Sequence, residues 1–223
     1  IMPSLVGSEM CIRDSNYAAA YGATGGYFDK SGNSLYGGPA FQKGMQMVVD
    51  FYQKGYAPKE SISWGFNEIV TGFYSGTCAM LQQDADALIG IAEKMDGKDF
   101  GVIPAPLSAN GKAYPNAGFA GWAMTSASPN KDESWKLIQY LTANKQNLEW
   151  AKVVGVLPVH QGAEADSAFA GEHWAGWFQT LKQADKYQPL IPPVNLPEWG
   201  AMYDKTMVEN GQELLLGLSL IHI

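Results

Sequence analysis

The sequence predicts an α/β protein whose strands form a largely parallel sheet. Three observations lead to this class. Apolar residues recur every three or four positions in several segments, which is typical of amphipathic helices. Short apolar runs that end at Gly or Pro lie between those segments, as buried strands do. The two kinds of segment alternate along the chain, an order that favours parallel strands joined by helices.

The first predicted elements are a loop, two helices and a strand. Residues 21–38 are rich in Gly and Asn, which is typical of a loop. A helix is predicted from Pro39, a residue that suits a first helical turn, to Gly55, which ends it. Its apolar stripe consists of Phe41, Met45, Val48, Val49 and Tyr52. A shorter helix is predicted over 66–76, and a short buried strand over 77–81.

The middle of the chain continues the alternation. Asp84 is placed to cap a helix over 85–95. Strands are predicted over 100–106 and 119–127, with a loop over 108–118 between them. We therefore expect both apolar runs to join the sheet.

A helix that follows Pro129 has a clear start. Asn130 is predicted to cap it, with Glu133 at the capping-box position. Its buried stripe is expected to consist of Trp135, Ile138 and Leu141. The remaining predicted elements are a helix over 145–154, an extended segment over 155–160, and helices near 171–185 and 197–213.

The two ends of the chain encode one short DNA element in opposite orientations. Back-translated, residues 10–15 have a reverse complement that, shifted by one base, encodes the final "LSLIHI". The element is similar to the end of a transposon-based sequencing adapter. We interpret 1–15 and 218–223 as translated adapter, not native sequence, and expect 16–217 to be a fragment. The alternative is a native N-terminal arm and C-terminal tail.

The composition excludes several classes of protein. The chain has a formal net charge of −7 and no Lys/Arg cluster, which disfavours binding to nucleic acid or to an anionic membrane. No apolar run approaches the roughly 18 residues of a membrane span. Outside the predicted adapter only Cys78 remains, so no disulfide framework and no cysteine-based metal site is expected. The chain has 7 Trp and 11 Tyr, which suits a flat polar ligand, although aromatic residues also fill cores.

Enzyme signatures are missing from the sequence. It contains no nucleophile elbow, phosphate-binding loop, dinucleotide fingerprint or zinc-protease motif. Asp84 and Asp86 are the nearest approach to paired carboxylates, and they flank a glycosidic bond only if the backbone separates them by about 5 Å or more. A helix cap is the simplest role for Asp84, ligand hydrogen bonding is the alternative, and catalysis is least favoured. No cofactor is expected, although such carboxylates can also hold a cation.

Five segments resemble, in order, the extracellular solute-binding proteins of ABC importers, in the carbohydrate-binding group that includes maltose-binding protein. They are "GFNEIVTGFYSGTCAMLQQDADAL", "FGVIPAPLSANGK", "GFAGWAMTSASPNKDESWKLIQYLT", "VLPVH" and "PEWGAMYDKTMVENGQELLLG". The resemblance implies a type II periplasmic-binding-protein fold with two lobes that close about a hinge. It places 16–118 and 161–217 in the second lobe, and 119–160 in the first.

The resemblance also implies a function and a site. The protein is expected to be a monomeric, non-enzymatic receptor that captures a sugar in the cleft between the lobes and delivers it to the membrane permease of the importer. It is expected in the periplasm or lipid-anchored at the cell surface. By resemblance, the turn after the strand at 77–81 contacts the ligand, Trp199 stacks on a sugar ring, and Trp122 beside Gly121 is a second stacking candidate. The residues of the turn are Gln82, Gln83, Asp84 and Asp86.

Alternatives remain at this point. Each tryptophan can instead be ordinary core. The same fold also takes polyols or glycerol-phosphate compounds in this family, but neither 82–86 nor 119–123 contains the Lys or Arg that a phosphate favours. An alternative from another class is a carbohydrate-active enzyme, which would release shortened products.

Overall fold

The computed structural model describes residues 2–4, 17–22, 27–116, 118 and 120–218. The chain divides into two compact units. Unit 1 comprises 1–83, 105–118 and 180–223, and unit 2 comprises 84–104 and 119–179. The predicted lobes have other bounds, because 84–104 and 161–179 group here with 119–160. The assignment of segments to lobes stays a prediction.

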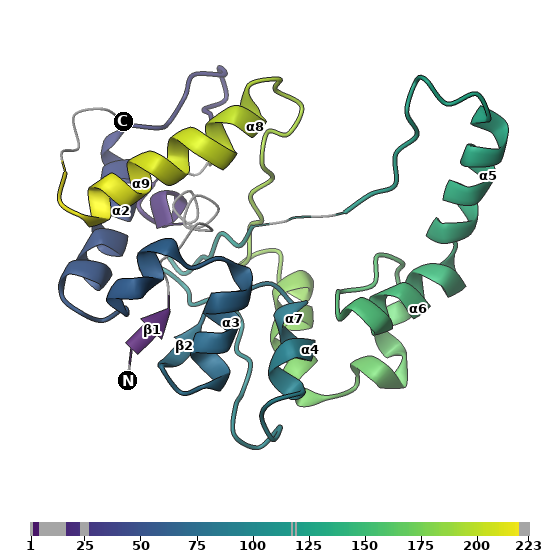
Figure 1. The fold of residues 1–223 in the computed structure, drawn as a ribbon, viewed down its shortest axis with the longest axis horizontal. Helices are drawn as coiled ribbons and strands as arrows, with labels where there is room; N and C mark the ends of the chain where they lie inside the picture. Colours follow the sequence, from purple (N-terminus) through teal and green to yellow (C-terminus); the bar gives the residue numbers. More distant parts are fainter. Residues whose placement is uncertain (1, 5–16, 23–26, 117, 119, 219–223) are drawn as a thin grey trace. The chain divides into compact units, whose positions relative to one another are not determined.

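Unit 1 contains a two-stranded parallel sheet. Strand β2, Cys78–Leu81, confirms the position of the strand predicted over 77–81 and pairs with β1, Met2–Ser4 (Figure 1). The prediction that this strand is buried is wrong, because only Cys78 is buried and Met80 is 60% exposed. β1 belongs to the stretch interpreted as adapter, and pairing says nothing about the origin of those residues. Apart from 2–4 and 218, both predicted adapter stretches lie outside the described residues, so this interpretation stays a prediction.

Helix α2, Pro39–Gln53, confirms the first predicted helix. It begins after the extended Gly38, with Pro in its first turn, and the chain leaves it through Gly55 at a φ of 74°. That left-handed conformation costs glycine no steric clash, so Gly55 is suited to end the helix. The buried stripe is Phe41, Gly44, Met45, Val48 and Val49, whereas Tyr52 is half-buried.

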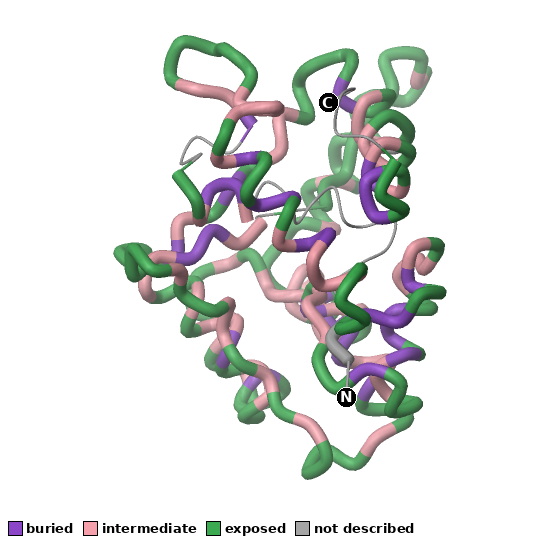
Figure 2. The backbone as a smooth tube through the Cα atoms, turned by 90° about the vertical axis from the view of Figure 1, so that its left-hand side faces the viewer, coloured by how far each residue is buried: buried purple, intermediate pink, exposed green. Residues whose placement is uncertain are grey.

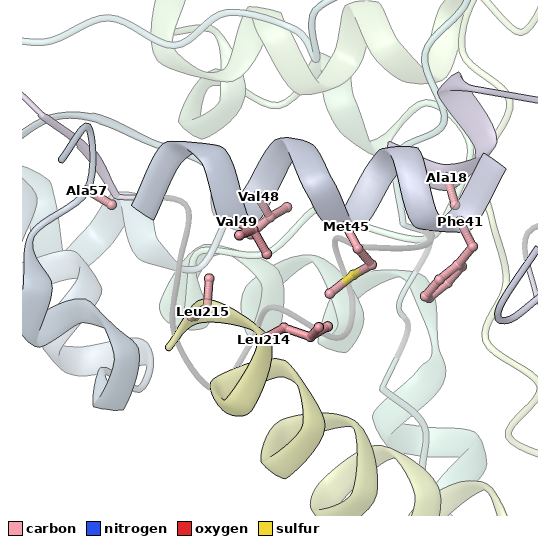
Figure 3. Packing of buried hydrophobic residues seen from close by; sticks show 8 residues of the cluster. All are labelled: Ala18, Phe41, Met45, Val48, Val49, Ala57, Leu214 and Leu215. Carbon is pink, nitrogen blue, oxygen red and sulfur yellow. The ribbon is translucent and has the colours of Figure 1, made fainter. Parts of the chain in front are cut away.

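The main core of unit 1 lies between α2 and α9, Met207–Leu215. Leu214 and Leu215 of α9 point toward the stripe of α2 (Figure 3). The cluster consists of Ala18, Phe41, Met45, Val48, Val49, Ala57, Leu214 and Leu215, all buried (Figure 2 shows the burial along the chain). Each large side chain in it contributes about 1.5–3 kcal/mol by leaving water. This core joins α2 and α9, two helices that lie far apart in the sequence.

Helix α3, Phe66–Tyr74, leads into β2. The side chain of Glu68 accepts a hydrogen bond from the backbone N–H of Gly65 at 3.1 Å, which satisfies a donor at the start of the helix. Gly72 allows close approach, because a Cβ there would lie 2.7 Å from the Trp64 ring. A 3-10 turn, Lys59–Ser63, precedes the helix.

A second parallel contact in unit 1 involves a segment that was predicted to be loop. Ala113 pairs with Tyr187, and Asn116 with Leu190, as isolated parallel bridges. The hydrogen bonds include Gln188 N–H to Ala113 O at 2.9 Å. The loop predicted over 108–118 did not include these bridges, because Gly111 and Pro115 in the first segment and Pro189 in the second are residues typical of loops.

Unit 2 is mainly helical in its described residues. Its helices are α4 (Ala87–Ala92), α5 (Lys131–Thr142), α6 (Asn144–Val154) and most of α7 (Glu172–Lys182), and its 3-10 turns are Ala163–Ala165 and Ser167–Phe169. The predicted strands over 100–106 and 119–127 are not strands in the described part of the chain. A strand requires a neighbour that exchanges backbone hydrogen bonds with it, so an apolar run alone does not determine whether a strand forms.

Helix α5 begins where predicted but differs in two details. Asn130 occupies the N-cap position, yet its carbonyl accepts from Ser134 Oγ at 2.7 Å and no side-chain cap with Glu133 forms. The predicted buried stripe is also wrong. Trp135 is 54% exposed, and none of the residues of α5 is buried, although all are described. Its apolar side chains pack on little of the described chain.

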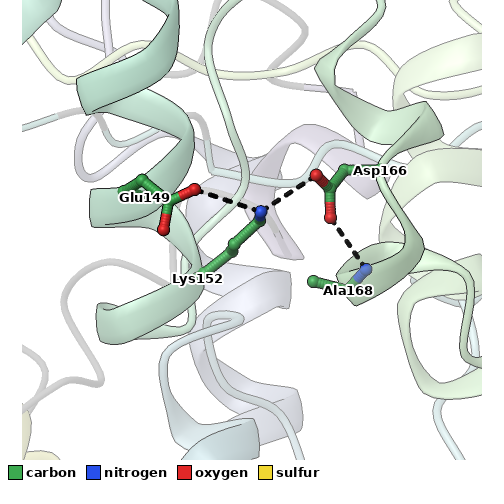
Figure 4. A network of polar contacts seen from close by, with 4 residues as sticks. All are labelled: Glu149, Lys152, Asp166 and Ala168. Atoms are coloured by element: carbon green, nitrogen blue, oxygen red, sulfur yellow. Dashed lines mark hydrogen bonds and ion pairs between the residues drawn. The ribbon is translucent and has the colours of Figure 1, made fainter.

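Lys152 links α6 to the 3-10 turn that follows Asp166 (Figure 4). Its Nζ lies 2.9 Å from Asp166 Oδ2 and 3.3 Å from Glu149 Oε1. The Oδ1 atom of Asp166 accepts from the backbone N–H of Ala168 at 2.9 Å. The Ala168 hydrogen bond, followed by the Lys152 ammonium, holds the pKa of Asp166 below its ordinary value.

Replacing Asp166 with asparagine is expected to reduce the loss of unfolding free energy that occurs as the pH falls. Because the pKa of Asp166 is lower in the folded protein, its contribution is present above the unfolded pKa of about 4 and is lost as pH falls through the folded value. Denaturant unfolding between about pH 7 and 3 should therefore show a smaller loss for Asp166→Asn than for the parent chain. Asp99→Asn, at an exposed acid of the same unit, is the charge-matched control. Equal slopes for parent and Asp166→Asn would contradict this account.

Candidate ligand-binding site

The turn that follows β2 carries four of the predicted ligand residues. Gln82 is half-buried, and its Oε1 accepts a hydrogen bond from the Tyr17 hydroxyl at 2.7 Å. That bond orients the amide, whose nitrogen carries two N–H donors. Gln83 is also half-buried and, with Gln82, belongs to unit 1.

The carboxylates of the turn lie in unit 2. Asp84 is exposed, and its backbone carbonyl accepts from Ala87 N–H at 3.2 Å. The prediction that Asp84 caps the helix is wrong, because α4 begins later and Asp86 occupies the N-cap position without a side-chain cap bond. The sequence over 82–86 therefore places two amides and two carboxylates on the connection between the units.

Trp122 and Gly121 lie in an exposed segment of unit 2. The indole of Trp122 is 50% exposed and meets Trp150 of α6 edge to face, with ring centroids 5.7 Å apart. Among the described residues nothing lies within 4 Å of where a Cβ on Gly121 would be. The sequence reasoning missed Trp150, which is 51% exposed and adds a second accessible ring.

Trp199 has different surroundings. It begins α8, Trp199–Ala201, and is only 7% exposed. Its indole meets Tyr27 edge to face at 4.9 Å and stacks on Tyr203 at 5.5 Å with an interplanar angle of 25°. A π-helical turn, Met202–Thr206, follows at once. The ring is thus packed in unit 1, and its stacking on a sugar stays a prediction.

The seven predicted residues are divided between the two units. Gln82, Gln83 and Trp199 belong to unit 1, and Asp84, Asp86, Gly121 and Trp122 belong to unit 2. Within the described residues, no cluster of three or more His, Cys, Asp or Glu could hold a metal ion. None of the described helices has both the length and the apolar character that crossing a membrane requires.

The sequence of residues 12–177 matches the family of bacterial extracellular solute-binding proteins. The chain belongs to this family. The predicted resemblance is therefore confirmed, and the match covers most of the chain. No curated protein matches this solute-binding protein by sequence.

Solved structures confirm the fold class of this solute-binding protein. The maltose-maltodextrin binding protein of Alicyclobacillus acidocaldarius matches with a TM-score of 0.76 and 20% identity, over 98% of this chain and 57% of its own. Maltose-bound MalE3 of T. maritima matches with a TM-score of 0.77 and 19% identity, over 95% of this chain and 54% of its own. UgpB of Mycobacterium tuberculosis, in complex with glycerophosphocholine, matches with a TM-score of 0.69 and 20% identity, over 97% and 58%. The chain thus spans little more than half the length of these proteins, as part of a two-lobed fold.

Proposed function

We propose that the chain is part of the substrate-binding component of an ABC importer, which captures a sugar or oligosaccharide for uptake. The match of residues 12–177 to the solute-binding family carries this proposal. Similar solved structures support it, since they include a maltose-maltodextrin binding protein and a Thermotoga lettingae binding protein with α-D-tagatose. The protein works without catalysis and releases its ligand intact.

The residue types of the candidate site suit a polyhydroxylated ligand. The amides of Gln82 and Gln83 can donate hydrogen bonds to sugar hydroxyls and accept them, and the carboxylates of Asp84 and Asp86 accept them. The apolar C–H faces of a sugar ring pack on indole faces. Trp199, the first candidate by resemblance, is 7% exposed, and Trp122, the second candidate, is half exposed. The Tyr17 bond to Gln82 supports a preset orientation of one polar group.

Transport requires the complete protein. In the proposed mechanism the ligand bridges two lobes in the cleft between them and stabilises the closed form, which the membrane permease recognises. The protein acts as a monomer in the periplasm or on a lipid anchor at the cell surface. The family name, which describes extracellular proteins, supports this location.

Residues 119–160 are assigned to the first lobe of the complete protein. The support comes from α5 and α6, where apolar side chains lack cover in the described chain. They are Trp135, Leu137, Tyr140, Trp150 and Val153, each more than half exposed. Exposed apolar patches of this kind mark surfaces that contact other protein. Further first-lobe residues would cover this face.

A titration of the full-length protein with maltose, α-D-tagatose and glycerophosphocholine tests the ligand class. The neutral sugars should bind more tightly, because 82–86 and 119–123 contain no Lys or Arg to pair with a phosphate. Trp122→Ala should weaken sugar binding by about 1–3 kcal/mol, the range of a packed aromatic side chain. Leu181→Ala, which removes an exposed apolar side chain of unit 1 outside the site, should leave binding unchanged. If glycerophosphocholine binds most tightly, the ligand class is a phosphodiester and not a sugar.

A further inference from the structure

Helix α2 has a second organised face besides its buried stripe. A cavity of about 380 Å³ lies along this face, and none of the seven predicted sugar-binding residues lines it. The helix contributes residues at spacings of three or four, so they form one continuous stripe. They are Lys43, Gln46, Met47, Asp50, Phe51 and Lys54. Together with Tyr21 and Tyr56 they define the α2 groove, which lies entirely within unit 1.

The lining of the α2 groove is mainly apolar and aromatic. Met47 and Phe51 are half-buried, whereas Tyr21 and Tyr56 are 49% and 53% exposed. The rings of Phe51 and Tyr56 meet edge to face at 6.1 Å. Accessible rings beside a thioether offer packing surface for a flat apolar group. A cavity of this volume falls in the lower part of the range for small-molecule sites, about 300–1,000 Å³.

The charged residues of the α2 groove differ in whether they have a partner of opposite charge. Asp50 pairs with Lys54 at 2.6 Å and accepts from Gln46 Nε2 at 2.8 Å. These hydrogen bonds, with that of Lys54 first, lower the pKa of Asp50, so its carboxylate is already matched within the groove. Lys43 is exposed and has no acidic partner among the described residues. One uncompensated positive charge therefore borders an apolar surface on a chain whose net charge is −7.

We infer that the α2 groove binds a small aromatic carboxylate. The ring packs against the aromatic side chains and Met47, and the carboxylate pairs with the Lys43 ammonium. A neutral or cationic analogue loses that pairing, because Lys54 and Asp50, the other charged residues among the described lining, are already paired with each other. This site is independent of sugar capture.

Nuclear magnetic resonance of the Met47 methyl group in the full-length protein tests the inference. Phenylacetate, phenylacetamide and phenethylamine are the probes, since they share a ring and differ in charge. Phenylacetate should shift the Met47 signal in a saturable way and bind about two- to five-fold more tightly than the amide, as expected for one solvent-exposed ion pair. Phenethylamine should bind most weakly.

Charge reversal gives the sharper comparison. In Lys43→Glu the order should invert, with phenethylamine the tightest ligand. Lys30→Glu changes the net charge equally at another exposed position of unit 1 and should keep the parent order. Unchanged affinities in Lys43→Glu, or no saturable shift at Met47 in the parent chain, would overturn the inference.

Discussion

Replacing Trp199 with alanine is expected to lower the free energy of unfolding by about 3–5 kcal/mol, the usual cost of removing a large buried aromatic side chain. The indole is 7% exposed and contacts the rings of Tyr27 and Tyr203, so its removal leaves a cavity and ends both ring contacts. Denaturant unfolding of the two chains measures the difference.

Trp122→Ala is the matched control for this substitution. Trp122 is 50% exposed, so its replacement should lower the free energy of unfolding only slightly. The expected loss is about 0.5 kcal/mol, in addition to what the contact with Trp150 contributes. Equal losses for the two variants would contradict the packing described for Trp199. If Trp199 also stacks on sugar in the complete protein, its alanine variant should lose affinity even under conditions where it stays folded.

Leu215→Ala is expected to cost about 2–5 kcal/mol of unfolding free energy. Leu215 is 2% exposed and belongs to the core where α9 packs on α2 (Figure 3). The neighbouring Leu216 is 59% exposed, so Leu216→Ala removes the same atoms from the surface and should change stability by less than about 0.5 kcal/mol. The difference between the two midpoints of thermal or denaturant unfolding measures the core contribution. A larger loss for Leu216→Ala would contradict the orientation of α9.

Local sequence patterns predicted the helices better than the strands. Pro39, a regular apolar stripe and Gly55 define α2 without reference to the rest of the chain. The apolar runs over 100–106 and 119–127 resemble strands equally well, but strand formation depends on a partner elsewhere in the protein. Similarly, the pattern of α5 predicted a buried stripe, whereas Trp135 is exposed because burial depends on what packs against the helix.

In the candidate site, too, features set by neighbouring residues could be predicted from sequence, and features set by residues distant in the chain could not. The turn at 82–86 follows from the order of strand and helix, so its polar residues could be located from sequence. The surroundings of Trp199 and Trp122 could not, because a pattern does not distinguish a packed indole from an accessible one. The α2 groove was also missed, since its α2 residues lie opposite the buried stripe, on the face that a helical pattern assigns to solvent.

The proposed function requires that the full-length protein bind a sugar and leave its covalent structure unchanged. The most direct measurement is to incubate the full-length protein with maltotriose, determine the bound stoichiometry by titration calorimetry, and recover the sugar for mass analysis. The account predicts saturable binding of one maltotriose or other small sugar per chain, with the sugar recovered unchanged. Release of glucose or maltose, or no saturable binding of maltotriose, maltose or α-D-tagatose, would contradict it.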